Sequence, residues 1–109
     1  MTKVFLKNTR RGVIVKISGH ALRPSDIRDY NIACACISAV SYSAYNIIRK
    51  MQQEGRLEGC KMEAKPGYMY MSVTARREYL RDLRCHMDML RTGLSMIKEK
   101  YPKSICFVG

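Results

Sequence analysis

The chain has 109 residues, with 20 Lys or Arg against 9 Asp or Glu, so its formal net charge is +11, and 47% of its residues are hydrophobic. These values fit a single basic globular domain over residues 1–109. They exclude a two-domain enzyme and a disordered basic tail, because disordered chains are poor in apolar side chains. No apolar stretch reaches the roughly 20 residues of a membrane span, and the N-terminal segment lacks the apolar region of a signal peptide. We therefore expect a cytoplasmic protein with no membrane association.

The first two predicted elements are strands. Residues 2–8 and 12–18 alternate between apolar and polar side chains around a short polar turn, which is typical of an antiparallel hairpin. Residues 32–51 are apolar on nearly every face, and this pattern predicts a buried helix. Gly55 follows shortly afterwards, where a glycine suits the end of a helix.

The second half of the chain repeats this arrangement. Residues 57–64 and 68–74 predict a second hairpin, with Pro66 and Gly67 in its turn, and Thr74 is placed to cap the next helix. Apolar residues then recur at spacings of three and four, which predicts one buried helix seam: Leu80, Leu83, Met87, Leu90, Leu94, Ile97 and Tyr101. Pro102 ends this helix, and residues 104–108 favour a last strand. The order ββαββαβ predicts an α+β fold, a mainly antiparallel sheet with two helices.

Cysteine usage limits the classes of protein. The five cysteines are irregularly spaced: Cys34, Cys36, Cys60, Cys85 and Cys106. An odd number without a regular framework argues against a secreted disulfide-rich protein, so we expect free thiols. No CxxC pair occurs, and His20 and His86 lie far apart in the sequence, so the usual spacing of zinc ligands is missing. The sequence predicts neither a metal site nor a cofactor.

His20 and Cys34 have the clearest capacity for catalysis. Cys34 lies near the predicted helix start, where main-chain N–H groups lack partners and the helix dipole favours a thiolate. His20 follows Gly19 at the end of a predicted strand, and imidazole is the usual base for a cysteine nucleophile. The alternative is that Cys34 is a buried core thiol and that His20 only packs or caps. The residues alone leave both interpretations open.

The remaining cysteine and histidine positions on the helices have structural interpretations. Cys36 lies about 200° around a helix from Cys34, so it cannot share that face, and we interpret it as a core residue. Cys85 and His86 are neighbours on the last predicted helix, where adjacent side chains diverge. We interpret this pair as partly exposed helix surface.

Three segments carry a family resemblance: Ser18-Gly19-His20-Ala21, then Asn31-Ile32-Ala33-Cys34-Ala35-Cys36-Ile37-Ser38-Ala39-Val40, and Lys100-Tyr101-Pro102-Lys103-Ser104-Ile105. In this order they resemble the ribosomal-processing cysteine protease (Prp) family, over nearly the whole chain. The resemblance implies that His20 and Cys34 form a catalytic dyad. The implied substrate is large-subunit ribosomal protein number twenty-seven with an N-terminal extension, whose removal permits ribosome assembly. A related phage structural protein is a second candidate substrate, and the family's dimeric state implies a homodimer.

The chain departs from the family pattern just before the cysteine. Asp29 and Asn31 stand where the family usually has glycine and aspartate, and the stretch from His20 to Cys34 is longer. Asn31 can cap a helix but brings no charge to stabilise an imidazolium, so Asp29 or Asp26 is a candidate for that task. Ser38 in the CAxxS motif is a further candidate for orienting the site. The alternative for both aspartates is that they are solvated loop carboxylates.

The favoured reaction is amide hydrolysis by a His/Cys dyad. The main-chain N–H groups of Cys34 and Ala35, at the predicted helix start, are expected to form the oxyanion hole. The rival hypothesis is a non-catalytic, basic, dimeric module that binds ribosomal RNA or a ribosomal protein. Its candidate contacts are Arg10, Arg11, Arg23, Arg28 and Tyr30. In either case we expect a homodimer, because the two helices present more apolar surface than a sheet of this size can cover.

Overall fold

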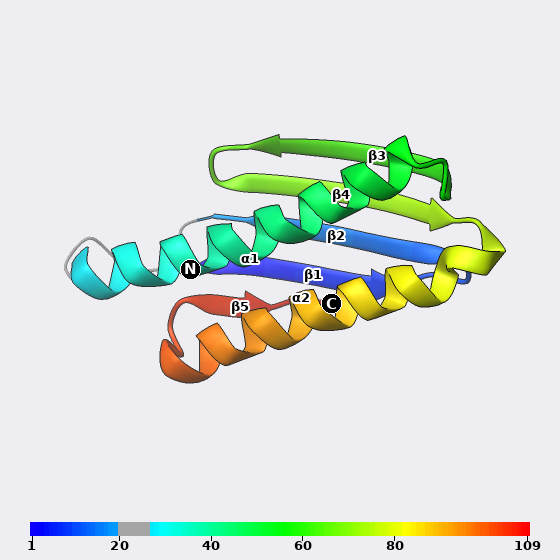
Figure 1. Ribbon diagram of the computed structural model, residues 1–109. Helices are drawn as coiled ribbons and strands as arrows, with labels where there is room; N and C mark the ends of the chain where they lie inside the picture. Colours follow the sequence, from blue (N-terminus) through cyan, green and yellow to red (C-terminus); the bar gives the residue numbers. More distant parts are fainter. Residues whose placement is uncertain (20–26) are drawn as a thin grey trace.

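The computed structural model describes residues 1–19 and 27–109, and its elements follow the predicted order ββαββαβ (Figure 1). The strands are β1 (Thr2–Asn8), β2 (Gly12–Ser18), β3 (Leu57–Lys65), β4 (Tyr68–Ala75) and β5 (Ile105–Phe107). The helices are α1 (Ile27–Gln53) and α2 (Leu80–Lys100), and the short 3-10 helix η2 (Arg77–Tyr79) precedes α2. The predicted α+β fold is confirmed.

The strands form one sheet in the order β3-β4-β2-β1-β5. The pairs β3–β4, β4–β2 and β2–β1 are antiparallel, and β5 pairs parallel to β1. The main-chain N–H of Thr2 donates to the carbonyl of Ser104 at 2.8 Å, which extends the β1–β5 pairing by one bond. The mainly antiparallel sheet is therefore confirmed, and the one parallel pair follows from the crossover of the chain through α2.

Both helices lie on the same face of the sheet, so the fold has two layers (Figure 1). The core lies between the layers, where Val13, Val15 and Ile17 of β2 are buried while Lys16 between them is exposed. The predicted seam of α2 faces this core, with five buried members: Leu83, Met87, Leu90, Leu94 and Ile97. Apolar residues at every second position bury one face of a strand, and apolar residues three or four positions apart bury one side of a helix.

Helix α1 differs from the prediction in two respects. It begins at Ile27 instead of residue 32, and it is buried on one side only. Ala33, Ile37 and Ile48 are buried, whereas Ile32 and Tyr42 are 39% and 41% exposed. The sheet and α2 contact one side of the helix, and a two-layer fold has no third layer to cover the other side. The apolar composition of the helix was therefore a poor guide to its burial.

The start of α2 also differs from the prediction. Thr74 does not cap a helix, because β4 continues through Ala75 and α2 begins at Leu80. Ala75 pairs with Leu57, and its N–H donates to the carbonyl of Arg11 at 2.9 Å, so the ladder extends past Thr74. The sheet's hydrogen bonds outweigh the capping preference of one threonine.

Candidate active site

Gly19 fixes the path of the chain as it leaves β2. Its φ is +97°, and its N–H donates to the carbonyl of Gly67 in the β3–β4 turn at 2.9 Å. A Cβ at Gly19 would lie 2.9 Å from the carbonyl oxygen of Met1, so both the conformation and the space require glycine. The residue after Gly19 is His20, so this hydrogen bond anchors the chain one residue before the predicted base.

A small hollow of about 70 Å³ lies between this anchor, α1 and the β3–β4 turn. Gly19, Ser38, Ser41 and Tyr42 line it, together with Lys65 and Tyr68 of the turn. Ser41 is only 3% exposed, and its Oγ has no hydrogen-bond partner among the described residues. A buried hydroxyl without a partner normally costs free energy, so Ser41 is suited to bind a polar group that enters the hollow.

Cys34 lies on α1 four residues before Ser38, close to one helical turn. Its side chain is half-buried and packs against the hydrophobic core. Ser38 is exposed and lines the hollow. The turn of α1 that follows Cys34 and the residue that precedes His20 thus belong to the same small hollow.

The oxyanion hole predicted at the helix start does not fit the observed helix. Cys34 is the eighth residue of α1, and only the first four N–H groups of a helix lack internal partners. The N–H groups of Cys34 and Ala35 therefore fall where they donate to carbonyls four residues earlier in the helix. The helix dipole also acts mainly within the first turn, so it does not account for an activated Cys34. Ser25 and Asp26, residue types that favour N-caps, were the sequence signal for an earlier start.

The other predicted site residues are placed as follows. His20 and Asp26 lie outside the described residues. Asp29 and Asn31 lie in the first two turns of α1, and their side chains fall outside the described part of the structure. Asn31 is the fifth residue of the helix, so its predicted role as N-cap is wrong. Among these candidates with described side chains, Ser38 is the one that lines the hollow.

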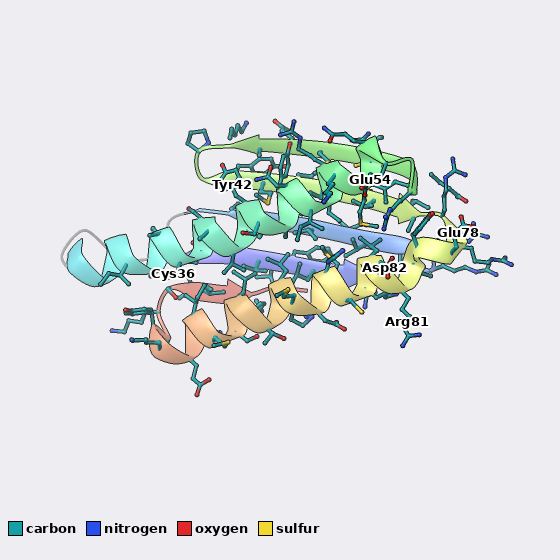
Figure 2. The ribbon with its side chains drawn as sticks, in the orientation of Figure 1. Cys36, Tyr42, Glu54, Glu78, Arg81 and Asp82 are labelled. Carbon is teal, nitrogen blue, oxygen red and sulfur yellow. The ribbon has the colours of Figure 1, made fainter. Side chains whose placement is uncertain are left out.

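The remaining cysteines fall into two groups. Cys36 was predicted to be in the core but is exposed on α1 (Figure 2), because only one side of that helix packs. Cys85 is exposed and His86 half-buried on α2, which confirms their interpretation as helix surface. Cys60 on β3 and Cys106 on β5 are half-buried, and burial raises the pKa of the Cys60 thiol. All five thiols are free.

The sequence analysis missed Ser41, Tyr42, Lys65 and Tyr68. The turn that carries Lys65 and Tyr68 was predicted, but its position beside the end of β2 depends on the pairing of Ser18 with Tyr68. Ser41 and Tyr42 stand one turn beyond Ser38 in the CAxxS motif, and this spacing was an available signal.

Within residues 1–19 and 27–109, no three or more His, Cys, Asp or Glu side chains gather in a way that could hold a metal ion. In the same part of the chain, neither helix is long and apolar enough to cross a membrane.

A family model described as cysteine protease Prp matches residues 1–106. Solved structures of similar fold include an essential ribosomal processing protease Prp from S. aureus with a covalently linked product peptide, at 22% identity and a TM-score of 0.67, covering 98% of this chain and 97% of that one. The same S. aureus protease with a substrate peptide has 18% identity and a TM-score of 0.72, covering 99% and 98%. SMU.848 from Streptococcus mutans has 17% identity and a TM-score of 0.64, covering 98% and 91%. No curated protein matches the chain in sequence.

Proposed function

We propose, because the chain belongs to the family of cysteine protease Prp, that His20 and Cys34 form the dyad with which it cuts its substrate. The observation that supports this dyad most directly is the shared hollow. It is lined by Gly19, which a peptide bond joins to His20, and by Ser38, one turn along α1 from Cys34. A substrate held there would lie beside Gly19, which precedes His20 in the chain, and beside the turn of α1 that follows Cys34.

The reaction follows from the chemistry of the two side chains. His20 takes the proton of the Cys34 thiol, and the thiolate sulfur attacks the scissile carbonyl carbon. When the tetrahedral intermediate collapses, the C–N bond breaks and His20 gives its proton to the leaving amine. Water then attacks the thioester with His20 as base, which releases the acid and restores the thiol. Cys34 lies well inside α1, where the helix dipole has little effect. Formation of its thiolate therefore depends on His20.

Ser38 is the strongest candidate among the proposed positioning residues. It lines the hollow beside the hydroxyl of Ser41, which has no hydrogen-bond partner in the described part of the chain. Two hydroxyls on successive turns can bond the main chain of an extended peptide, whose N–H and C=O groups need partners once they leave water. Asp26, Asp29 and Asn31 remain candidates for orienting His20.

The proposed substrate is large-subunit ribosomal protein number twenty-seven with an N-terminal extension, with a related phage structural protein as the second candidate. The similar S. aureus enzyme is described as a ribosomal processing protease and binds a substrate peptide. We propose that this processing takes place in the cytoplasm. The small volume of the hollow, about 70 Å³, suits a short side chain or a stretch of main chain.

A cleavage assay tests this function. The full chain, incubated with the extended ribosomal protein of its own organism and with the phage protein, should cut one of them once near the extension. Cys34→Ala should abolish cutting, and His20→Ala should reduce it by about 10²–10⁴-fold. Cys36→Ser is the matched control, because Cys36 is exposed two residues away on the same helix, and it should cut normally. Cutting by Cys34→Ala at the unaltered rate would exclude the dyad and favour the non-catalytic binding module.

The proposed homodimer has a candidate interface between the helices, on the side away from the sheet. A groove of about 660 Å³ lies there, lined by Val40, Ala44 and Ile47 of α1 and by Met89, Gly93 and Met96 of α2. Met89 and Met96 are 72% and 65% exposed. One patch therefore carries both a recess and protruding apolar side chains, as a two-fold interface between identical chains requires.

Sedimentation of two variants tests this interface. Met89→Glu should give a monomer, because a charge would be buried against apolar side chains. Ser95→Glu, at an exposed α2 position outside the groove, should stay a dimer. A monomeric unaltered chain at tens of micromolar would contradict the homodimer.

A further inference from the structure

The sheet face that points away from α1 and α2 carries ordered rows of basic and aromatic residues. Strand pairing sets three rows across β1, β2, β4 and β3: Lys3, Ser18, Tyr68 and Lys65; then Phe5, Lys16, Tyr70 and Glu63; then Lys7, Ile14, Ser72 and Lys61. We call these twelve residues the open sheet face. In the described part of the chain, both helices lie on the opposite side (Figure 1).

The charge of this face is strongly positive. It holds five lysines against one carboxylate, Glu63, and all five lysines are exposed. The Glu63 Oε1 lies 3.8 Å from the Lys65 Nζ, so the ammonium partly neutralises the negative charge of the carboxylate. Lysines spread over three rows and four strands make a broad positive surface, which is the electrostatic pattern expected for a phosphate backbone.

The aromatic residues lie between these lysines. Tyr70 on β4 is half-buried and is flanked in its row by Lys16 and Glu63. Tyr68 lies two residues away on the same strand, about 7 Å along it, and the Lys65 ammonium stands 5.2 Å from its ring centroid. Phe5 pairs with Lys16 across the β1–β2 ladder, and its ring lies against Gly109. Tyr70 is therefore the central ring of the face.

We propose that the open sheet face binds single-stranded RNA, with a base stacked on Tyr70 and with Lys16 and its neighbouring lysines against phosphates. An open sheet face with aromatic rings among lysines suits unpaired bases, whereas the bases of a duplex are already stacked on one another. An acidic peptide would match the lysines but would leave Tyr70 without a role. Of the RNA contacts expected from the sequence, Arg11 instead pairs with Glu58 at 3.2 Å. Arg23 and the side chains of Arg28 and Tyr30 lie outside the described part of the structure. Lys65 and Tyr68 border both this face and the hollow of the proposed proteolysis, whereas Lys16 and Tyr70 belong to the face alone.

Fluorescence anisotropy with a labelled single-stranded uridine dodecamer tests the proposal on the full chain. Affinity should fall steeply with salt, with a slope of about −0.7 in log K per phosphate neutralised. Tyr70→Ala should weaken binding about 5- to 150-fold, and Tyr70→Phe, which keeps the ring, should retain most of it. Lys16→Glu should also weaken binding. Lys50→Glu is its matched control, because Lys50 is exposed on α1 and the substitution changes the net charge equally.

Several results would overturn the proposal. If Lys16→Glu and Lys50→Glu reduce the affinity for the dodecamer equally, the RNA is attracted by the net charge of the protein alone. A Tyr70→Ala variant that binds normally would remove the stacking role, and equal affinity for duplex RNA would exclude single-strand recognition. The dodecamer could also fail to bind while the extension peptide of the ribosomal protein binds. If Lys16→Glu weakens that peptide binding, the open sheet face is a protein-docking site and not an RNA site. Peptide cutting is measured separately through Cys34→Ala, so the proteolysis and the RNA site can fail independently. Thermal unfolding of each variant checks that it folds.

Discussion

The Arg84 guanidinium of α2 donates a hydrogen bond to the main-chain carbonyl of Thr9 in the β1–β2 turn, with Nη2 2.7 Å from the oxygen. Its Nη1 also donates to the carbonyl of Gly12 at 3.1 Å. One part-buried side chain therefore joins a helix to a turn more than seventy residues away in the sequence. Arginine suits this position because its planar fork can reach two acceptors at once, which a lysine ammonium does less well.

Arg84→Ala should lower the free energy of unfolding by about 2–4 kcal/mol, since hydrogen bonds from a charged group contribute roughly 1.5–3 kcal/mol each and part of that is recovered by water. Urea unfolding measures this loss. Arg81→Ala is the control on the same helix, because Arg81 is exposed and points into solvent (Figure 2). Equal stability of the two variants would show that the Arg84 contacts contribute little.

Gly12 on β2 leaves no room for a side chain, because an added Cβ would overlap the main-chain carbonyl of Val73 on β4. That carbonyl is part of paired backbone, so relief requires the β2–β4 ladder to separate. Gly12→Ala should cost about 3 kcal/mol or more. Gly59→Ala is the matched control, since its Cβ would meet only the Thr74 side chain at 3.9 Å. Thermal unfolding should show a large drop for Gly12→Ala and little change for Gly59→Ala.

The sequence predicted those features that depend on local periodicity. The seam from Leu83 to Ile97 and the alternation in β2 each require only that one side of an element be buried. The burial of α1 could not be predicted in this way, because the number of layers decides whether Cys36 is covered. The hollow was out of reach for a related reason. Gly19 and Tyr68 both line it because β2 pairs with β4, and no local sequence pattern specifies which strands pair.

Cys60 provides a test of the core at alkaline pH. Burial raises the pKa of its thiol above that of the unfolded chain, so the folded state holds the proton more tightly. As the pH rises past the unfolded pKa, the unfolded chain ionises first, and stability falls until the folded pKa is passed. Cys60→Ala removes this contribution. The stability of the unaltered chain relative to Cys60→Ala should therefore decrease between pH 7 and pH 10, as measured by urea unfolding. A constant difference would contradict the burial effect.

The last prediction concerns the reactivity of Cys34. Exposure alone favours Cys36, which is exposed, over Cys34, which is half-buried. An unassisted thiol is only a few per cent ionised at pH 7, so a base that takes its proton can raise the thiolate population about tenfold or more. If His20 is that base, iodoacetamide at neutral pH should modify Cys34 before Cys36, as followed by mass spectrometry.

His20→Ala should reverse this order, because only access then decides and Cys36 is the more accessible thiol on the same helix. The rate at Cys36 should itself stay constant, so it serves as an internal control in the same sample. Faster modification of Cys36 in the unaltered chain would contradict activation by His20. Since the helix dipole cannot act on the eighth residue of α1 with useful strength, no other described feature would then remain to activate Cys34.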